Sequence, residues 1–331
     1  MFVHEPSKAD LAHWTKLGSS TLNQDPFSCT PAWQLSYRDH AYPDRPLLIR
    51  KSGDNMITLC QATDRSGQLH LAPIESRWCF GANLLGREAV SLLEDTLVDI
   101  EKHYAPNFPK IVVSGIKPAG LAHQNLRTAF RNQFEFSAFR TDTQCAASLS
   151  GGFDGYLSRR SSNTRRNIKK QTRRALDAGV AFERHSPSTP IEAWVLYERM
   201  IAVELTSWKG IGHCGMAEDN ISPFYRAMIR RLSETGDARV IMARFEDKDV
   251  GFIFGGMAGR IYRGQQFSYD EDWSAGSIGN VMQAEQINWL CEDGATRYDL
   301  GPLIGRSMEY KQHWTEQSFD MKSWVLAKRH R

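Results

Sequence analysis

The sequence lacks the cysteine patterns that hold a metal ion or build a disulfide framework. Its six cysteines are scattered, with no Cys-x-x-Cys pair and no histidines at matching spacing, so neither a zinc site nor a disulfide scaffold is predicted. No apolar run approaches the length that spans a bilayer. The polar stretch from Met1 to Lys16 contains no apolar signal core. We therefore expect a cytoplasmic protein that does not bind a membrane or a metal.

Three catalytic signatures are also missing. There is no Gly-x-Ser-x-Gly nucleophile elbow, no His-Glu-x-x-His zinc motif and no Gly-x-x-x-x-Gly-Lys phosphate loop. The net charge of +3 over 331 residues is small, so any basic surface must be local. The length is sufficient for two domains with buried cores, and 41% hydrophobic with 24% charged residues is typical of a globular protein.

The first half of the chain predicts a mixed α/β domain. Residues 1–23 are polar and expected to be peripheral, although Leu11, Trp14 and Leu17 share one helical face. The regular elements that follow are a hairpin (Pro46–Arg50 and Met56–Cys60), a helix (Arg87–Tyr104), a strand (Lys110–Ser114) and a helix (Leu121–Asn132). Strand pairs followed by helix, strand and helix indicate an α/β domain that ends near Arg140.

The second half begins with a strand candidate, Cys145–Ser150, and then an unusually basic segment from Ser158 to Arg174. As a helix, this segment places Arg165, Lys169 and Arg173 in one row, and Arg166, Lys170 and Arg174 in the next. Ile168, Thr172, Ala175 and Leu176 then line the other side, and Gly179 fits a C-cap. The like charges in these two rows repel one another, and an anionic partner would relieve that repulsion. That partner is a nucleic acid, the phosphates of a nucleotide cofactor or acidic substrate, or acidic residues elsewhere in the fold.

Helices and strands alternate in the rest of the chain. The predicted elements are helices Ile191–Leu205 and Ser222–Glu234, with Ser222 as N-cap, strands Ala238–Phe245, Val250–Met257 and Arg260–Tyr269, a helix Gly279–Cys291 and a strand Arg297–Leu300. The third strand is joined to the third helix by a turn, Ser274-Ala275-Gly276-Ser277-Ile278-Gly279-Asn280. A glycine turn that opens a helix can bind a phosphate through unpaired N–H groups, or it can simply allow a tight turn.

This order of elements resembles the GNAT superfamily of N-acyltransferases. More closely, the second half is similar to the acetyltransferase-like family associated with cellulose biosynthesis, which is related to the Fem peptidyltransferases. The matching motifs, in order between about Gly152 and Trp314, are Arg165-Arg166-Asn167-Ile168-Lys169-Lys170, Ser207-Trp208-Lys209-Gly210, Phe224-Tyr225, Tyr269-Asp270, Ser274-Ala275-Gly276-Ser277, Tyr298-Asp299-Leu300-Gly301 and Tyr310-Lys311-Gln312-His313-Trp314.

The resemblance implies two tandem GNAT-like domains with a mixed sheet: a degenerate companion domain (1–140) and an acyltransferase domain (141–331). It further implies that the turn binds the pyrophosphate of an acyl-coenzyme A, most simply acetyl-coenzyme A, and that backbone amides of Phe267, Ser268 and Tyr269 polarise the thioester carbonyl. The turn departs from the commonest GNAT pattern, which carries Arg or Gln ahead of the glycines. A longer acyl-coenzyme A or an aminoacyl-tRNA, as in the Fem branch, therefore stays open as donor.

Acyl transfer to an amine needs a base for the nucleophile and a proton source for the leaving thiolate. Glu204 is the candidate base, unless it is only a helix-end carboxylate paired with Lys209. Tyr310 is the candidate acid, unless it only packs. The candidate substrate-binding residues are Trp208, Lys209, Asp270, Asp299 and Lys311, although the two aspartates can also simply end their strands.

The interpretation is an N-acyltransferase that acts on a small amine or amino-acid-like acceptor. The alternative is a nucleic-acid-binding protein, or an aminoacyl-tRNA-dependent transferase, that uses the Arg165–Arg174 face. The oligomeric state is left open by the sequence.

Overall fold

The computed structural model describes residues 2–20, 25–64, 66–303 and 305–329. The chain forms two compact units, Met1–Gln144 together with Ser318–Arg331, and Cys145–Gln317. The C-terminal segment therefore belongs to the first unit, whereas the division predicted from the sequence places it in the second.

The first unit contains a mixed sheet in the order β1-β2-β3-β4-β6-β13-β7, with β5 beside β3. Its strands are β1 (Phe2–Val3), β2 (Leu47–Ser52), β3 (Asn55–Thr63), β4 (Leu69–Ala72), β5 (Leu84–Leu85), β6 (Lys110–Ile116), β7 (Phe134–Ser148) and β13 (Gln317–Lys328). β4 and β6 are parallel, with Leu71 opposite Ile111. The predicted hairpin is confirmed as β2 and β3, which pair from Leu47↔Cys60 to Ser52↔Asn55.

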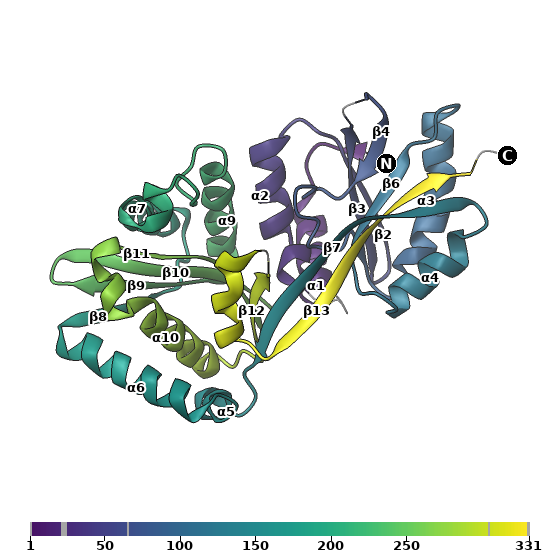
Figure 1. The fold of residues 1–331 in the computed structure, drawn as a ribbon. Coiled ribbons are helices and arrows are strands. Elements are labelled where there is room, and N and C mark those ends of the chain that lie inside the picture. The colour runs from purple at the N-terminus through teal and green to yellow at the C-terminus, as the bar shows by residue number, and fades with distance from the viewer. Residues whose placement is uncertain (1, 21–24, 65, 304, 330–331) are drawn as a thin grey trace. The chain divides into compact units, whose positions relative to one another are not determined.

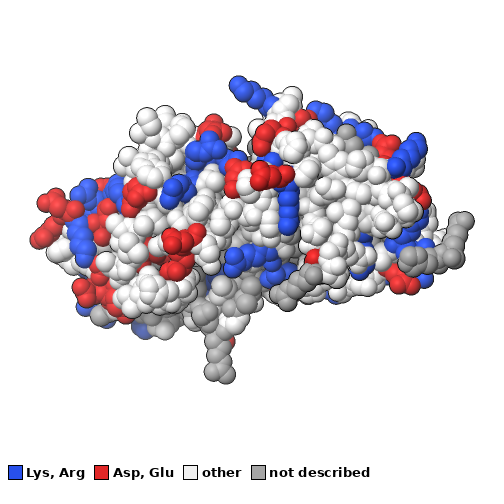
Figure 2. All heavy atoms as spheres, turned by 90° about the horizontal axis from the view of Figure 1, so that it is seen from above, with Lys and Arg blue, Asp and Glu red and all other residues white. Residues whose placement is uncertain are grey.

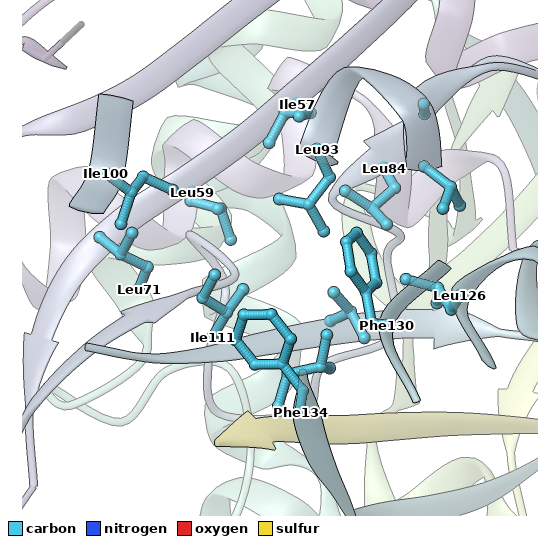
Figure 3. Packing of buried hydrophobic residues seen from close by; sticks show 14 of the residues in the cluster. Ile57, Leu59, Leu71, Leu84, Leu93, Ile100, Ile111, Leu126, Phe130 and Phe134 are labelled. Atoms are coloured by element: carbon cyan, nitrogen blue, oxygen red, sulfur yellow. The ribbon is translucent and has the colours of Figure 1, made fainter. Parts of the chain in front are cut away.

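Helices α3 (Ala89–Tyr104) and α4 (Leu121–Phe130) were both predicted and are confirmed. Figure 3 shows how Leu93 and Ile100 of α3 and Phe130 of α4 point into a common core with side chains of the strands. Each such fully buried side chain stabilises the fold by about 1.5–3 kcal/mol.

The N-terminal segment is part of the core of the first unit, so the prediction that it is peripheral is wrong. Helix α1 (Lys8–Ser20) buries Trp14 completely and Leu17 almost completely. The indole of Trp14 donates to the carbonyl of Cys29 at 2.7 Å. Cys29 is the last residue of the short 3-10 helix η1 (Phe27–Cys29), which precedes α2 (Pro31–Ala41), and neither helix was predicted. The helical stripe of Leu11, Trp14 and Leu17 was the correct signal.

The second unit contains strands in the order β8-β9-β10-β11-β12, and β12 is also bonded to β7 on its other side. Its strands are β8 (Val180–His185), β9 (Ala238–Phe245), β10 (Lys248–Ala258), β11 (Ile261–Tyr269) and β12 (Arg297–Pro302). The three-strand meander is confirmed as the antiparallel strands β9, β10 and β11. Strand β8, which pairs antiparallel with β9, was not predicted.

Helices cover both faces of this sheet, as Figure 1 shows. On one face lie α5 (Gly152–Ser158), α6 (Ser162–Asp177) and α10 (Ile278–Glu292), and on the other α7 (Pro190–Thr206) and α9 (Ser222–Thr235). The short helix α8 (Trp208–Ile211) follows α7 and packs against it. The basic helix is confirmed as α6, with Ser161 as N-cap. Its predicted packing face is wrong at Leu176, which is 55% exposed, because Ile168 and Ala175 alone turn inward fully.

The predicted N-cap of α9 is also wrong by one residue. Ile221 holds that position and Ser222 is already helical. The hydroxyl of Ser222 does not cap the helix, because it lies 2.8 Å from the Tyr197 hydroxyl, which also donates to the Ser222 carbonyl at 2.9 Å.

Candidate active site

The parallel strands β11 and β12 are paired only over their first residues. The register runs from Ile261↔Arg297 to Arg263↔Asp299. Beyond this point β11 continues to Tyr269 along its partner β10, whereas β12 ends at Pro302. The edge of β11 from Gly264 onward is therefore not paired with β12 in the described part of the chain, and its backbone groups on that side are open to other partners.

Glu204, the predicted base, lies at this end of β11. It comes near the end of α7 and is fully buried. Its Oε1 accepts a hydrogen bond from the backbone N–H of Met216 at 2.7 Å, and its Oε2 accepts from the hydroxyl of Ser268 on β11. Gly215 is required beside it, since a Cβ there would lie 2.0 Å from the carboxylate oxygen. The carboxylate of Glu204 is thus linked to β11 through the hydroxyl of Ser268.

Lys209 does not pair with Glu204, which was the alternative role for that carboxylate. Its Nζ donates to the carbonyl of Phe267 at 2.6 Å and to Oε1 of Gln266 at 3.0 Å. Burial lowers the pKa of Lys209, and the charge of Glu204 opposes that shift. The ammonium of Lys209 on α8 therefore holds the C-terminal end of β11 in place.

Gln266 and Tyr225 extend the same network, and neither was singled out as a site residue from the sequence. The amide Nε2 of Gln266 donates to the Tyr225 hydroxyl at 2.6 Å. Burial raises the pKa of Tyr225 to about 12, so the phenol is neutral at physiological pH. Tyr225 belongs to a motif quoted above, whereas Gln266 lies in a strand pattern that carries no sign of a buried polar partner.

Tyr310 and Lys311 come from the 3-10 helix η3 (Arg306–His313), which follows β12. The ring of Tyr310 lies 6.3 Å from that of Phe267. Although 39% of the Tyr310 residue is exposed, its low-dielectric surroundings raise the pKa of the phenol to about 12. Lys311 is buried and donates from Nζ to the carbonyl of Pro302 at 2.8 Å. Burial, helped by the charge of Arg263, lowers the pKa of Lys311 to about 7.

The glycine turn is built from two short segments. Asp270 caps the 3-10 helix η2 (Glu271–Gly276), and Ser277, with φ of 56°, precedes the start of α10 at Ile278. Among the described residues no side chain caps α10, so the N–H groups of its first two residues, Ile278 and Gly279, have no partner within the helix. A Cβ added at Gly276 would meet nothing within 4 Å. The turn thus offers an uncapped helix end with free space in front of it, which fits a phosphate group.

The two glycines of the turn have different surroundings. A Cβ at Gly279 would lie 2.7 Å from the ring of Phe267 and 2.9 Å from that of Tyr269, so this glycine allows α10 to pack on β11. Ile278 is buried, which leaves only its backbone for a ligand. Asn280 is turned toward α6, where its amide donates to Gln171 at 3.3 Å. Ser274 is exposed, and the side chain of Ala275 lies outside the described residues.

The basic helix α6 packs beside α10 and η2. Arg165 donates to the carbonyl of Arg160 at 2.7 Å, and Arg166 to the side chain of Asn163 at 2.9 Å. Within the described ranges, no acidic residue forms an ion pair with Lys169, Lys170, Arg173 or Arg174, and all four are exposed. A groove of about 500 Å³ runs between the side chains of Arg166, Lys169, Lys170, Arg173, Arg174 and Asp177.

These contacts give no support to the hypothesis that acids elsewhere in the fold neutralise α6. On the face drawn in Figure 2, by contrast, basic and acidic side chains are interspersed. The accumulation of positive charge is a local property of α6, next to the uncapped end of α10.

The remaining predicted site residues lie apart from the network. Trp208 is half exposed on α8. Asp270 accepts from Lys248 at 2.6 Å and from the N–H of Asp272 at 3.1 Å, and these contacts hold the pKa of its carboxyl below its usual range. Asp299 forms a bidentate pair with Arg297, with both contacts at 2.6 Å. Both aspartates are thus engaged with neighbouring groups. Asp270 directly follows the end of β11, whereas Asp299 lies within β12 and does not end it.

In the part of the chain that the structure describes, no three His, Cys, Asp or Glu side chains gather closely enough to hold a metal ion. None of the helices in the same ranges has both the length and the apolar character needed to cross a membrane.

Comparisons with known proteins give a family match for part of the chain and a fold match for nearly all of it. Residues 162–312 match the family model described as acetyltransferase (GNAT) domain. No curated protein matches the sequence. Two solved structures are similar over nearly the whole chain. A conserved protein of unknown function from Bacteroides thetaiotaomicron VPI-5482 is 12% identical, with a TM-score of 0.67 and coverage of 98% of this chain and 99% of that one. FemX is 13% identical, with a TM-score of 0.66 and coverage of 97% and 96%.

A third structure is the C-terminal domain of a putative lysylphosphatidylglycerol synthetase from Agrobacterium fabrum. It is 12% identical, with a TM-score of 0.59 and coverage of 96% of this chain and 91% of that one. At these identities the likeness concerns the fold. The link with cellulose biosynthesis stays a prediction. The second unit thus contains an acetyltransferase (GNAT) domain, and the similar structures share the mixed α/β fold of the whole chain.

Proposed function

We propose that this protein transfers an acyl group, most simply acetyl, from an acyl-coenzyme A to the amine of a small or amino-acid-like acceptor in the cytoplasm. In this reaction the amine nitrogen attacks the thioester carbonyl, the C–N bond forms and the C–S bond breaks. The amine loses a proton and the leaving thiolate gains one. The chain's own residues must therefore bind an anionic donor, orient and polarise the thioester carbonyl, and accept the proton of the amine.

The turn before α10 carries the donor part of the proposal. Its uncapped helix end and the free space at Gly276 suit a pyrophosphate, and the exposed cations of α6 lie on the neighbouring helix. The missing Arg or Gln of the commonest GNAT turn is compensated in this proposal by α6. Lys169 and Lys170 are exposed there without an acidic partner in the described ranges.

The network at the end of β11 carries the chemical part. Glu204 accepts the proton of the amine, directly or through the hydroxyl of Ser268, to which it is already hydrogen-bonded. Lys209 fixes the carbonyl of Phe267. Because a strand residue points its N–H and C=O to the same side, the N–H of Phe267 faces the same gap and can donate to the acyl oxygen. The neutral phenol of Tyr310, beside the ring of Phe267, can protonate the thiolate.

Calorimetric titration of the protein with acetyl-coenzyme A and its desulfo analogue tests the donor site. We expect binding by the wild type, and its loss in Gly276→Glu, because a carboxylate would stand where the pyrophosphate binds. Gly276→Gln separates the effect of charge from that of size, since glutamine has the same size without the charge and an added Cβ meets nothing within 4 Å. If both variants bind as well as the wild type does, the turn is not the donor site.

A second candidate function rests on the exposed cations of α6. By the resemblance to the Fem branch, the donor would be an aminoacyl-tRNA, or the protein would bind nucleic acid without catalysis. RNA binding with a steep dependence on salt, weakened by Lys169→Glu and Lys170→Glu, would favour this candidate. If RNA protects the protein against thermal unfolding and no coenzyme A species does, the acyl-coenzyme A proposal fails.

A further inference from the structure

Helix α7 is apolar on both of its faces. Its inner face packs against the sheet and α9, and it buries Ala193, Leu196, Tyr197, Met200 and Val203. On the opposite side, residues three or four positions apart form an exposed row, here called the outer α7 stripe: Ile191, Trp194, Val195, Glu198, Ala202 and Leu205. A helix that is apolar all round is normally covered all round, and α7 is covered by the chain on one side only.

The outer α7 stripe is large for a surface that stays in water. Ile191 is 76%, Trp194 48%, Val195 54% and Leu205 59% exposed. With Trp208 and Ile211 of the adjoining α8, at 50% and 64%, these side chains expose roughly 700 Å² of apolar surface, above the largest patch of a typical monomer. This area approaches the roughly 800 Å² that each partner contributes to a standard protein interface.

Two residues of opposite charge, Glu198 and Arg226, lie at the stripe. Glu198 lies within the stripe, and Arg226 of α9 lies at its edge, 5.0 Å above the ring of Trp194 and 5.8 Å from that of Tyr197. No ion pair to either residue is found in the described ranges. A stripe that carries one acid and one base near each other is complementary to a second copy of itself, because a two-fold axis brings each acid toward the base of the other copy.

We propose that two copies of this chain associate through the outer α7 stripe, with their α7 helices packed antiparallel about a two-fold axis. Glu198 of each copy then lies near Arg226 of the other, and Ala202 allows close approach of the helices. Trp and Arg are the residues that most often dominate such interfaces. A bilayer is a poorer occupant, since it would bury Glu198 without a partner. This inference is independent of the reaction proposed above.

Sedimentation velocity over a concentration series tests the association. We expect the wild type to be a dimer, and Val195→Asp to raise the dissociation constant at least about 30-fold, the effect of a central contact. Val98→Asp is the matched control, because Val98 on α3 is also 54% exposed on a helix but lies outside the stripe. It should leave the dissociation constant unchanged.

Charge exchange makes the test specific for the pairing. Glu198→Arg and Arg226→Glu should each weaken the dimer, whereas the double variant should restore it, since the opposite charges then meet again. Both positions are exposed, and unchanged circular dichroism confirms that the variants fold. A wild type that is monomeric at every concentration, a dimer insensitive to these variants, or a double variant without rescue overturns the proposal. If the protein is a monomer that binds lipid vesicles, and Val195→Asp abolishes this binding, the stripe binds a membrane and not a second copy.

Discussion

Lys311 should make the stability of this protein depend on pH in a way that can be calculated. The folded protein buries its ammonium against the carbonyl of Pro302, and burial with the charge of Arg263 lowers the pKa from 10.5 to about 7. Between these two values the unfolded chain binds a proton that the folded chain does not. Unfolding therefore takes up a proton, and the free energy of unfolding rises with pH through this window.

The size of the effect follows from the two pKa values. Between about pH 7 and pH 9, the contribution of Lys311 to the free energy of unfolding should grow by about 2 kcal/mol, because the folded group loses its remaining half proton while the unfolded group stays charged. Urea unfolding at about pH 7, 8 and 9 measures this slope. In Lys311→Met the slope should be smaller by that amount, and the variant should be more stable than the wild type at pH 7.

Lys209 provides the internal control for this prediction. Its pKa is also lowered by burial, so some increase of stability with pH should persist in Lys311→Met. If the wild type and the variant show the same slope, Lys311 is charged in the folded protein with an ordinary pKa. The inference that Lys311 of η3 is buried and partly neutral would then be refuted.

Further predictions concern single side chains of the second unit. Glu204→Gln should lower kcat about 10²- to 10⁴-fold in a steady-state assay with the acetyl donor, with the fold unchanged, because the amide can keep the hydrogen-bonded position but cannot accept a proton. An unaffected kcat would remove Glu204 from the mechanism. Gly255→Ala should destabilise the protein by about 1–3 kcal/mol in urea unfolding, because its Cβ would lie 2.3 Å from the Tyr262 hydroxyl and 2.4 Å from the Arg263 carbonyl. Gly276→Ala should change stability by less than about 0.5 kcal/mol, and a larger loss would mean that the space before α10 is filled.

The parts of the fold that could be predicted are those with local signals. The run Ala238–Phe245 is β9 as predicted, and α3 and α10 follow their apolar periodicity to within two residues. Strand β13 could not be found in this way. It pairs with β6, for example Leu326 with Ile111, across more than half of the chain, and a partner so distant leaves no trace in a local pattern.

The residues of the candidate site differ in the same way, because some carry a local sequence signal and others do not. Motifs indicated Lys209 and the turn, and Glu204 was a candidate because it lies at the end of a helix just before Trp208-Lys209. Their partners were not predictable in the same way. Whether Lys209 would turn to Glu204 or to Phe267 depends on how α8 lies against β11, and Gln266 joins the network only because Tyr225 reaches it from α9.

The glycine turn shows why a motif must be separated into its residues before it is interpreted. The two interpretations of the turn concern different glycines. Gly279 serves packing, since the rings of Phe267 and Tyr269 leave no room for a side chain. Gly276 has no such constraint, and no φ in the left-handed region requires a glycine there. A residue type that neither packing nor backbone conformation demands is best explained by what approaches from outside. The case for a phosphate at this turn therefore rests on Gly276 and on the uncapped start of α10.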